Sequence, residues 1–159
     1  MMDVRAKIMN WEKLAESIAR AKATGNVIGF TNGCFDILHL GHARYLNAAK
    51  KECDKFIVAI NSDSSVKRLK GPSRPINAEN ARVELIASLH AVDFVTIFEE
   101  DTPEKLIKFI TPNILFKGGD WEEDKIAGAG YVKSMGGKVR IIAYLDGYST
   151  TSLIDSLKK

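Results

Sequence analysis

Short apolar runs alternate with amphipathic stretches along this 159-residue chain, and this alternation constrains its fold more than any other feature. Runs rich in β-branched and aromatic residues predict strands over residues 27–31, 56–61, 92–98, 114–117 and 138–143. Apolar residues at helical spacing predict helices over residues 9–23, 41–51, 77–89, 102–110, 124–135 and 149–157. Residues 62–71 are expected to form a short helix that ends in a basic loop.

Five buried strands that alternate with helices predict a parallel sheet, because parallel strands need helical crossovers and are covered on both faces. Right-handed crossovers then give a doubly wound, Rossmann-like α/β fold. The length suits a single domain, which we expect to span residues 1–159. Such folds bind ligands beyond the carboxyl ends of their strands. Functional residues are therefore expected within residues 31–42, 61–75, 98–102, 117–121 and 144–152.

The composition argues against several classes of protein. The 23 basic and 20 acidic side chains leave a net charge of +3, which is too small and too evenly spread to indicate nucleic-acid binding. No apolar run approaches the roughly 20 residues that span a bilayer. The first residues lack the apolar core of a signal peptide, and two cysteines, Cys34 and Cys53, make no disulfide framework. We therefore expect a cytoplasmic protein with reduced thiols and with no nucleic-acid or membrane partner.

The segment after the first predicted strand carries the strongest chemical signal, and it reads TNGCFDILHLGH over residues 31–42. Gly33 allows a tight turn or the close approach of a ligand. His39 and His42 fall on one side of the first helical turn, and Gly41 between them leaves the backbone open. The start of the helix adds unpaired N–H groups and the positive end of its dipole. Together these groups suit a polyphosphate.

Three other interpretations of this segment compete. Cys34, Asp36, His39 and His42 have residue types that bind zinc, but residues around a turn do not obviously converge on one ion. The histidines could instead have a purely structural role, as a helix cap or as packing residues. The H-x-G-H spacing directly after a strand argues against this role. A P-loop or dinucleotide-binding Rossmann site is excluded, because the chain has no G-x₄-G-K-[ST] pattern. Its only G-x-G, Gly128 to Gly130, lies in a predicted helix and has no glycine three residues later.

Residues 31–42 resemble the HxGH signature of the nucleotidyltransferase superfamily, which includes cytidylyltransferases, adenylyltransferases and class I aminoacyl-tRNA synthetases. Further stretches follow in the expected order, namely Asn61-Ser62-Asp63, KRLKGPSRP, Arg82, EEDTPEKLI, LFKGGDW and residues 148–151. This set, over residues 27–157, is similar to stand-alone heptose 1-phosphate adenylyltransferase domains. The resemblance implies transfer of AMP from ATP to D-glycero-D-manno-heptose 1-phosphate. The products would be pyrophosphate and ADP-heptose, for lipopolysaccharide or surface-glycan synthesis.

The resemblance also implies roles for individual residues. His39, His42 and Lys70 are the expected catalytic residues, and their task is to stabilise charge around the α- and β-phosphates. Lys70 is preferred over Lys67 for the β/γ-phosphates. The expected substrate-binding residues are Lys67, Arg74 and Trp121. The nucleotide-binding residues that we expect are Thr31, Asn32, Gly33, Cys34, Phe35, Asp36, Gly41, Arg82, Lys117, Gly119, Asp120, Ser149 and Thr150.

Plainer alternatives exist for several of these residues. Lys67 and Lys70 belong to a charge run that solvent alone would explain, and Arg82 could pair with Glu79 or Glu84 on its own helix. Ser149 and Thr150 could simply cap the last helix. Asp36 is expected to orient the turn or to reach Mg²⁺ through water. Lys117 ends a buried strand, where an ammonium group needs an anionic partner.

The expected cofactor is Mg²⁺, which arrives with ATP and is held largely by the phosphates rather than by a protein cage. A homodimer or larger homo-oligomer is expected from the resemblance. A guanylyl- or cytidylyltransferase for another phosphorylated sugar or polyol is the nearest alternative function. Cytidylyltransferases carry a lysine or arginine at the position of Ser152, and this departure weakens the assignment as a cytidylyltransferase. A nucleotide-binding sensor without catalysis is the alternative from another class.

Overall fold

A five-stranded parallel sheet forms the centre of the computed structural model, which describes residues 3–143, 147–148 and 150–157. The strands are β1 (Ile28–Gly33), β2 (Lys55–Asn61), β3 (Phe94–Phe98), β4 (Ile114–Gly118) and β5 (Lys138–Ile142). The helices are α1 (Trp11–Ala23), α2 (Leu40–Lys50), α3 (Asp63–Lys70), α4 (Glu79–Ala87), α5 (Glu104–Ile110), α6 (Ala129–Ser134) and α7 (Thr150–Leu157). Two 3-10 turns, η1 (Val4–Lys7) and η2 (Glu123–Lys125), complete the described elements. The predicted α/β fold is confirmed.

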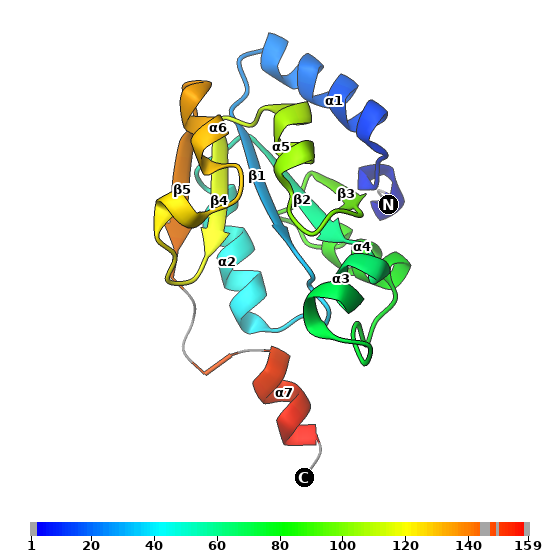
Figure 1. Ribbon diagram of the computed structural model, residues 1–159. Coiled ribbons are helices and arrows are strands. Elements are labelled where there is room, and N and C mark those ends of the chain that lie inside the picture. The colour runs from blue at the N-terminus through cyan, green and yellow to red at the C-terminus, as the bar shows by residue number, and fades with distance from the viewer. Residues whose placement is uncertain (1–2, 144–146, 149, 158–159) are drawn as a thin grey trace.

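The sheet has the order β3-β2-β1-β4-β5, so the chain moves outward from β1 on one side and then returns to its other side (Figure 1). This reversal lies between β1 and β4, where the register pairs Phe30 with Leu115. Crossovers that leave β1 in opposite directions separate there, which opens a crevice at the carboxyl ends of the strands. The fold therefore fixes where a ligand has room.

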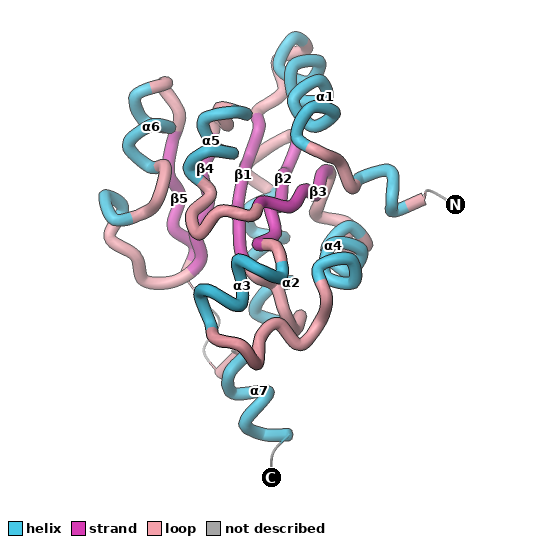
Figure 2. The backbone as a smooth tube through the Cα atoms, turned by 45° about the vertical axis from the view of Figure 1, so that its right-hand side comes forward, coloured by secondary structure: helices cyan, strands magenta, loops and turns pink. Residues whose placement is uncertain are grey.

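Helices cover both faces of the sheet (Figure 2), and an apolar layer of side chains lies on each face. Helices α1, α5 and α6 pack on the face that carries Phe30, Ile57 and Leu115. Helices α2 and α4 pack on the other face, against side chains such as Phe56 and Phe116, whose rings meet edge to face. Residues 56–60 of β2 alternate between the two layers and are all buried, as expected of a central parallel strand. Among the described residues, no helix is both long and apolar enough to cross a membrane.

The helix predicted over residues 124–135 is wrong in its first half. Residues 123–125 form η2, and α6 begins only at Ala129. Gly128 separates them, because its φ of +84° is incompatible with a continuous helix. Its backbone also packs so closely on Ile107 that a Cβ atom would lie 2.6 Å from the Ile107 Cδ1. The extra loop turns the β4–α6 connection toward the carboxyl ends of the strands.

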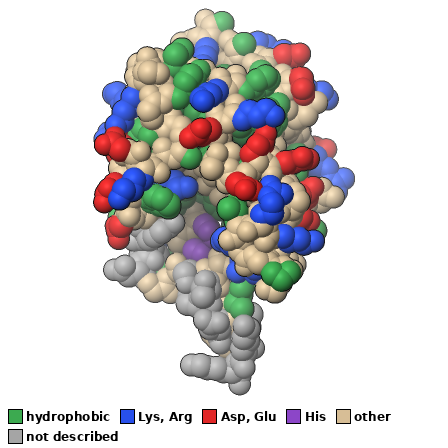
Figure 3. Space-filling view, in the orientation of Figure 1, with side chains coloured by type: hydrophobic (Ala, Val, Ile, Leu, Met, Phe, Trp, Pro, Cys, Tyr) green, Lys and Arg blue, Asp and Glu red, His purple; other side chains and the backbone are tan. Residues whose placement is uncertain are grey.

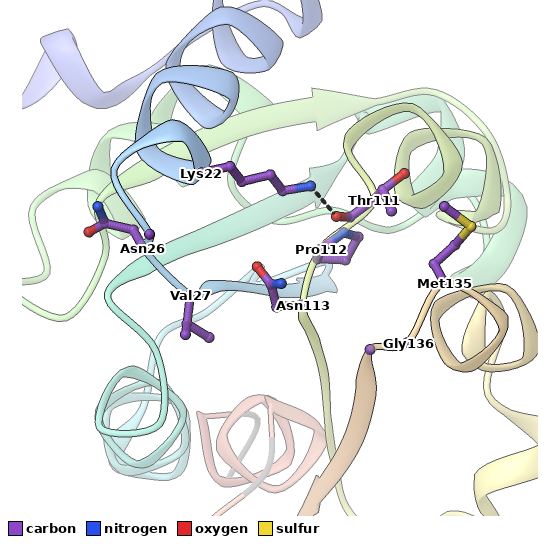
Figure 4. Close-up of a pocket in the computed structure, with 10 residues that line it drawn as sticks. Lys22, Asn26, Val27, Thr111, Pro112, Asn113, Met135 and Gly136 are labelled. Atoms are coloured by element: carbon purple, nitrogen blue, oxygen red, sulfur yellow. Dashed lines mark hydrogen bonds between the residues drawn. The ribbon is translucent and has the colours of Figure 1, made fainter.

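A cavity of about 380 Å³ lies at the opposite, amino ends of β1 and β4 (Figure 4). Its one ammonium group, on Lys22, donates hydrogen bonds to the carbonyl oxygens of Ile110 (3.2 Å) and Thr111 (2.5 Å). The Asn113 side-chain oxygen accepts from the N–H of Ile28 at 2.8 Å. These polar groups already end α5 and start β1, so we assign this cavity a structural role.

Candidate active site

A larger cavity, of about 570 Å³, lies at the carboxyl ends of β1, β2 and β4. Histidine side chains lie in a hollow of the molecular surface in Figure 3. The residues that line the cavity are Asn32, Gly33, Cys34, Phe35, Asp36, His42, Asn61, Leu69, Lys70, Asp101, Thr102, Pro103, Lys117, Gly118, Trp121, Lys125, Ile126, Ala127 and Thr150. This place is the one that the strand order predicts for a ligand.

His39 and His42 form a stacked pair at the start of α2. His39 is the N-cap residue with extended backbone, and its side chain makes no capping hydrogen bond. The two rings stack with centroids 3.8 Å apart and an angle of 23° between their planes. Gly41 makes this possible, because a Cβ atom there would lie 3.0 Å from the His39 ring. The pair and the free N–H groups of the first helical turn together form one donor surface.

Both imidazoles are held in the neutral form. Burial lowers the pKa of His42 to about 4, and the nearby charges of His39 and Lys70 add to the effect. Burial also lowers the pKa of His39. Neither buried Nδ1 atom makes a hydrogen bond of good geometry with a described residue. An incoming phosphate would bring negative charge to the two rings and would favour their protonation.

Asp36 connects the first turn to the segment 71–78, which we call the strap. Its carboxylate is 2% exposed and accepts from the N–H groups of Ile76 (2.8 Å) and Asn77 (2.9 Å) and from Arg74 Nε (2.6 Å). Burial alone would raise the pKa of Asp36, but these donors hold it below its ordinary value. These contacts agree with the expected role of Asp36 in orienting the turn, and both of its oxygens are engaged, so they do not favour contact with Mg²⁺ through water. Arg74 contacts Asp36, and it does not line the cavity.

Arg82 is fully buried and serves the frame of the site. Its guanidinium donates to the carbonyl oxygens of Cys34 (2.7 Å) and Asn77 (3.0 Å) and to Asp63 Oδ1 (2.8 Å). The prediction that Arg82 binds the nucleotide directly is not met in this arrangement, since its donors point to protein acceptors. The alternative pairing with Glu79 or Glu84 is wrong too, because the carboxylate that Arg82 contacts belongs to Asp63.

Lys70 and Lys117 line the cavity from different elements, and Lys125 of η2, which pairs with Glu122, lines it as well. Lys70 is the last residue of α3, and Lys117 lies near the end of β4. Burial lowers the pKa of Lys117, although the nearby Cys34 thiol opposes this. The Lys117 Nζ lies over the Trp121 ring, 5.1 Å from its centroid. Lys67 is exposed and outside the cavity, so the geometry favours Lys70 for phosphate contact.

The other predicted residues divide into three groups. Thr31 is buried in the core, where its hydroxyl bonds with Tyr45 Oη (2.7 Å) and the Phe116 carbonyl (3.2 Å), so its side chain is not available to a nucleotide. Gly119 and Asp120 line a separate surface hollow beside the edge strand β5. Ser149 lies outside the described residues, whereas Thr150 lines the cavity.

Nine lining residues were absent from the predicted site, namely Asn61, Leu69, Asp101, Thr102, Pro103, Gly118, Lys125, Ile126 and Ala127. Asn61 ends β2, and residues 101–102 follow β3. All of them lie in segments where functional residues were expected, so a positional signal existed for them. The described residues contain no group of three or more His, Cys, Asp or Glu side chains that could hold a metal ion.

The comparison with known proteins agrees with this geometry. A family model described as cytidylyltransferase-like matches residues 30–155. The chain belongs to the cytidylyltransferase-like family. The matched region runs from β1 into α7, so the family extends over the sheet and the cavity alike.

Proteins named bifunctional protein HldE are similar to this cytidylyltransferase-like chain over most of its length. The protein from Hahella chejuensis is 48% identical over 151 residues, which is 95% of this chain and 32% of that protein. The protein from Bradyrhizobium sp. is 50% identical over 148 residues, or 93% of this chain and 30% of that protein. The chain thus spans about a third of the length of these curated relatives.

Two solved structures are similar to this member of the family. The lipopolysaccharide core biosynthesis protein from Thermoplasma volcanium is 33% identical, with a TM-score of 0.63 over 79% of this chain and 100% of that chain. A pantoate-beta-alanine ligase from Francisella tularensis, determined with beta-gamma ATP and beta-alanine, has a TM-score of 0.57 over 95% of this chain and 76% of that chain. At 19% identity, the second likeness shows the fold alone.

Proposed function

We propose that this protein transfers AMP from ATP to D-glycero-D-manno-heptose 1-phosphate, giving ADP-heptose and pyrophosphate. The main support for nucleotidyl transfer is the stacked pair of His39 and His42 at the start of α2. The substrates are supported by the sequence resemblance, by identities near 50% to HldE proteins and by the likeness to a lipopolysaccharide core biosynthesis protein.

The reaction needs charge stabilisation more than base catalysis. An oxygen of the sugar phosphate attacks the α-phosphorus of ATP, a new P–O bond forms, and the bond to the departing pyrophosphate breaks. The nucleophile is already an anion at neutral pH, so no side chain has to remove a proton. His39, His42 and the first N–H groups of α2 stabilise the charge that develops between the α- and β-phosphates. Lys70 and Lys117 hold the phosphate chain from two sides of the cavity.

Mg²⁺ belongs to this reaction as the partner of ATP. The residues of the cavity do not fit an ion held by the protein, because the Asp36 carboxylate is already bound to N–H groups and Arg74 of the strap. Phosphate oxygens and water would hold the ion, which neutralises phosphate charge. We also propose that the protein acts in the cytoplasm, where ATP is made and where the free thiols of Cys34 and Cys53 stay reduced. The homo-oligomer stays a prediction that light scattering in solution would test.

Pyrophosphate release measured with heptose 1-phosphate and Mg²⁺, offered in turn with ATP, GTP, CTP and UTP, tests the proposal. Turnover with ATP alone is the expected result. Turnover with a different triphosphate would keep the mechanism and replace the nucleotide. If folded protein that binds ATP released no pyrophosphate with any of the four triphosphates, heptose 1-phosphate would be excluded as the acceptor. That result would favour either another phosphorylated substrate or a sensor.

A histidine variant tests the mechanism. His42→Ala is expected to lower kcat by about 10²–10³, because one preorganised donor to the developing charge is removed. His90→Ala is the matched control, since His90 is exposed and lies outside the cavity. Steady-state kinetics of both variants, with thermal unfolding to check the fold, give the answer. Wild-type turnover in folded His42→Ala would remove the histidine pair from the mechanism.

A further inference from the structure

The two sides of the active-site cavity differ in chemistry. On the side of β4, the lining includes the Trp121 ring with Ile126 and Ala127, beside the ammonium groups of Lys117 and Lys125. On the side of β2 and β3, it includes the hydrogen-bonding residues Asn61, Asp101 and Thr102, together with Lys70 and the apolar Leu69 and Pro103. These sides lie on opposite flanks of β1 in the strand order (Figure 1), with the histidine pair between them at the start of α2. The cavity thus offers one surface for a flat apolar group and another for hydrogen-bonding groups.

The polar side is fixed in place by the end of α3. Arg68 donates from Nε to Asp101 Oδ1 at 2.8 Å and from Nη2 to the Glu99 carbonyl at 2.5 Å. The Ser65 hydroxyl donates to the Glu100 carbonyl at 3.0 Å, and it accepts from Asn61 Nδ2 at 3.0 Å. These bonds hold the loop between β3 and α5 against α3 before any ligand arrives. A prearranged surface of this kind reduces the entropy cost of binding.

This surface keeps unused hydrogen-bonding capacity. Asp101 is 58% exposed, and within the described part of the chain its second oxygen, Oδ2, accepts no hydrogen bond. The Thr102 hydroxyl is exposed in the same lining and has no described partner either. A carboxylate only accepts hydrogen bonds, so it repels phosphates and attracts hydroxyl groups. Asp101 and Thr102 therefore suit the polyol part of a substrate, whereas Lys70 on the same side suits a phosphate.

We propose that Asp101 and Thr102 recognise hydroxyl groups of the acceptor sugar and so determine acceptor specificity. This inference rests on the proposed function and adds to it the side of the cavity where the acceptor lies. The acceptor would extend from the histidine pair toward the loop between β3 and α5, and the adenine would occupy the side of Trp121 and Ile126. The chemical class is a phosphorylated sugar rich in hydroxyl groups, rather than a small phosphorylated alcohol.

The test compares variants in their kinetics with heptose 1-phosphate and in their affinity for ATP. Asp101→Ala and Thr102→Val are each expected to lower kcat/KM for the sugar phosphate, by about 10- to 100-fold for the carboxylate, because a hydrogen bond to a charged group is lost. The Kd for ATP should stay within about twofold of wild type, since hydrogen bonds to the phosphates are untouched.

Two controls separate contact with the sugar from other effects. Glu99→Ala removes one negative charge from the same loop, as Asp101→Ala does, but the Glu99 side chain lies outside the cavity. Its kcat/KM for the sugar phosphate should equal that of the wild type. Arg68→Ala breaks the same ion pair as Asp101→Ala but keeps the carboxylate, so its loss in kcat/KM should be clearly smaller.

Three results would overturn the inference. The first is unchanged acceptor kinetics in both folded variants, and the second is an equal loss in Arg68→Ala, which would assign the effect to loop placement. The third is a wild-type protein that binds ATP but does not turn over any sugar phosphate. Only the third result also removes the proposed function, so the two failures are distinguishable.

Discussion

At the scale of single residues, the protonation state of His42 connects the fold to the proposed chemistry. The free protein holds this imidazole neutral, with a pKa near 4, because it is buried beside His39 and Lys70. A triphosphate brings negative charge to the ring and so raises its pKa. We predict that ATP binding takes up protons at pH 6. Calorimetric titration with a non-hydrolysable ATP analogue, in two buffers of different ionisation enthalpy, measures this uptake directly.

His42→Gln provides the comparison for this measurement, because glutamine donates a hydrogen bond but does not titrate. The uptake should fall in this variant, and His39 should account for what is left. Identical binding enthalpies in both buffers for the wild-type protein would contradict the prediction.

At the scale of elements, Arg82 joins three segments that are distant in sequence. Its guanidinium links the turn after β1, the end of the strap and the start of α3. Arg82→Met is predicted to lower the free energy of unfolding by about 3–5 kcal/mol, because it leaves buried acceptors without their partner. Arg5→Met is the control, since the exposed pair Arg5–Glu84 is worth at most about 1 kcal/mol. Urea unfolding at pH 7 compares the two variants, and equal losses would show that Arg82 has no structural role.

The same elements show what the sequence could predict. Strand positions and the location of the site followed from apolar runs and from the rule that ligands bind at carboxyl ends of strands. The roles of Asp36 and Arg82 did not follow, because their partners Ile76 and Asp63 lie 40 and 19 residues away, and only the folded chain brings them together. The break of the helix at Gly128 depends likewise on packing against Ile107. Sequence patterns report periodicity, but they do not report which distant polar groups meet.

At the scale of the whole molecule, acid is predicted to destabilise the protein in a defined window. Between the ordinary histidine pKa of 6.5 and about 4, the unfolded chain binds a proton at His42 that the folded chain does not bind. The free energy of unfolding therefore falls as the pH drops through this range. Asp36, whose pKa is lowered from 3.8, adds a further loss below the window. Urea unfolding at several pH values between 7 and 4 measures the trend.

His42→Gln should flatten this dependence, while His90→Gln, at an exposed position, should leave it unchanged. A free energy of unfolding that stays constant from pH 7 to pH 4 in the wild-type protein would contradict the assignment of a buried neutral imidazole.

The strand order has a consequence for synthesis on the ribosome. β1 pairs on one side with β2, which follows at once, but on its other side with β4, which begins at Ile114. A nascent chain that has emerged as far as β3 can assemble β1, β2 and β3, yet one edge of β1 stays uncovered until β4 appears. At about 5–20 residues per second, that edge is open to wrong pairing for a second or more. The central strand of the finished sheet is thus the vulnerable edge of the growing one.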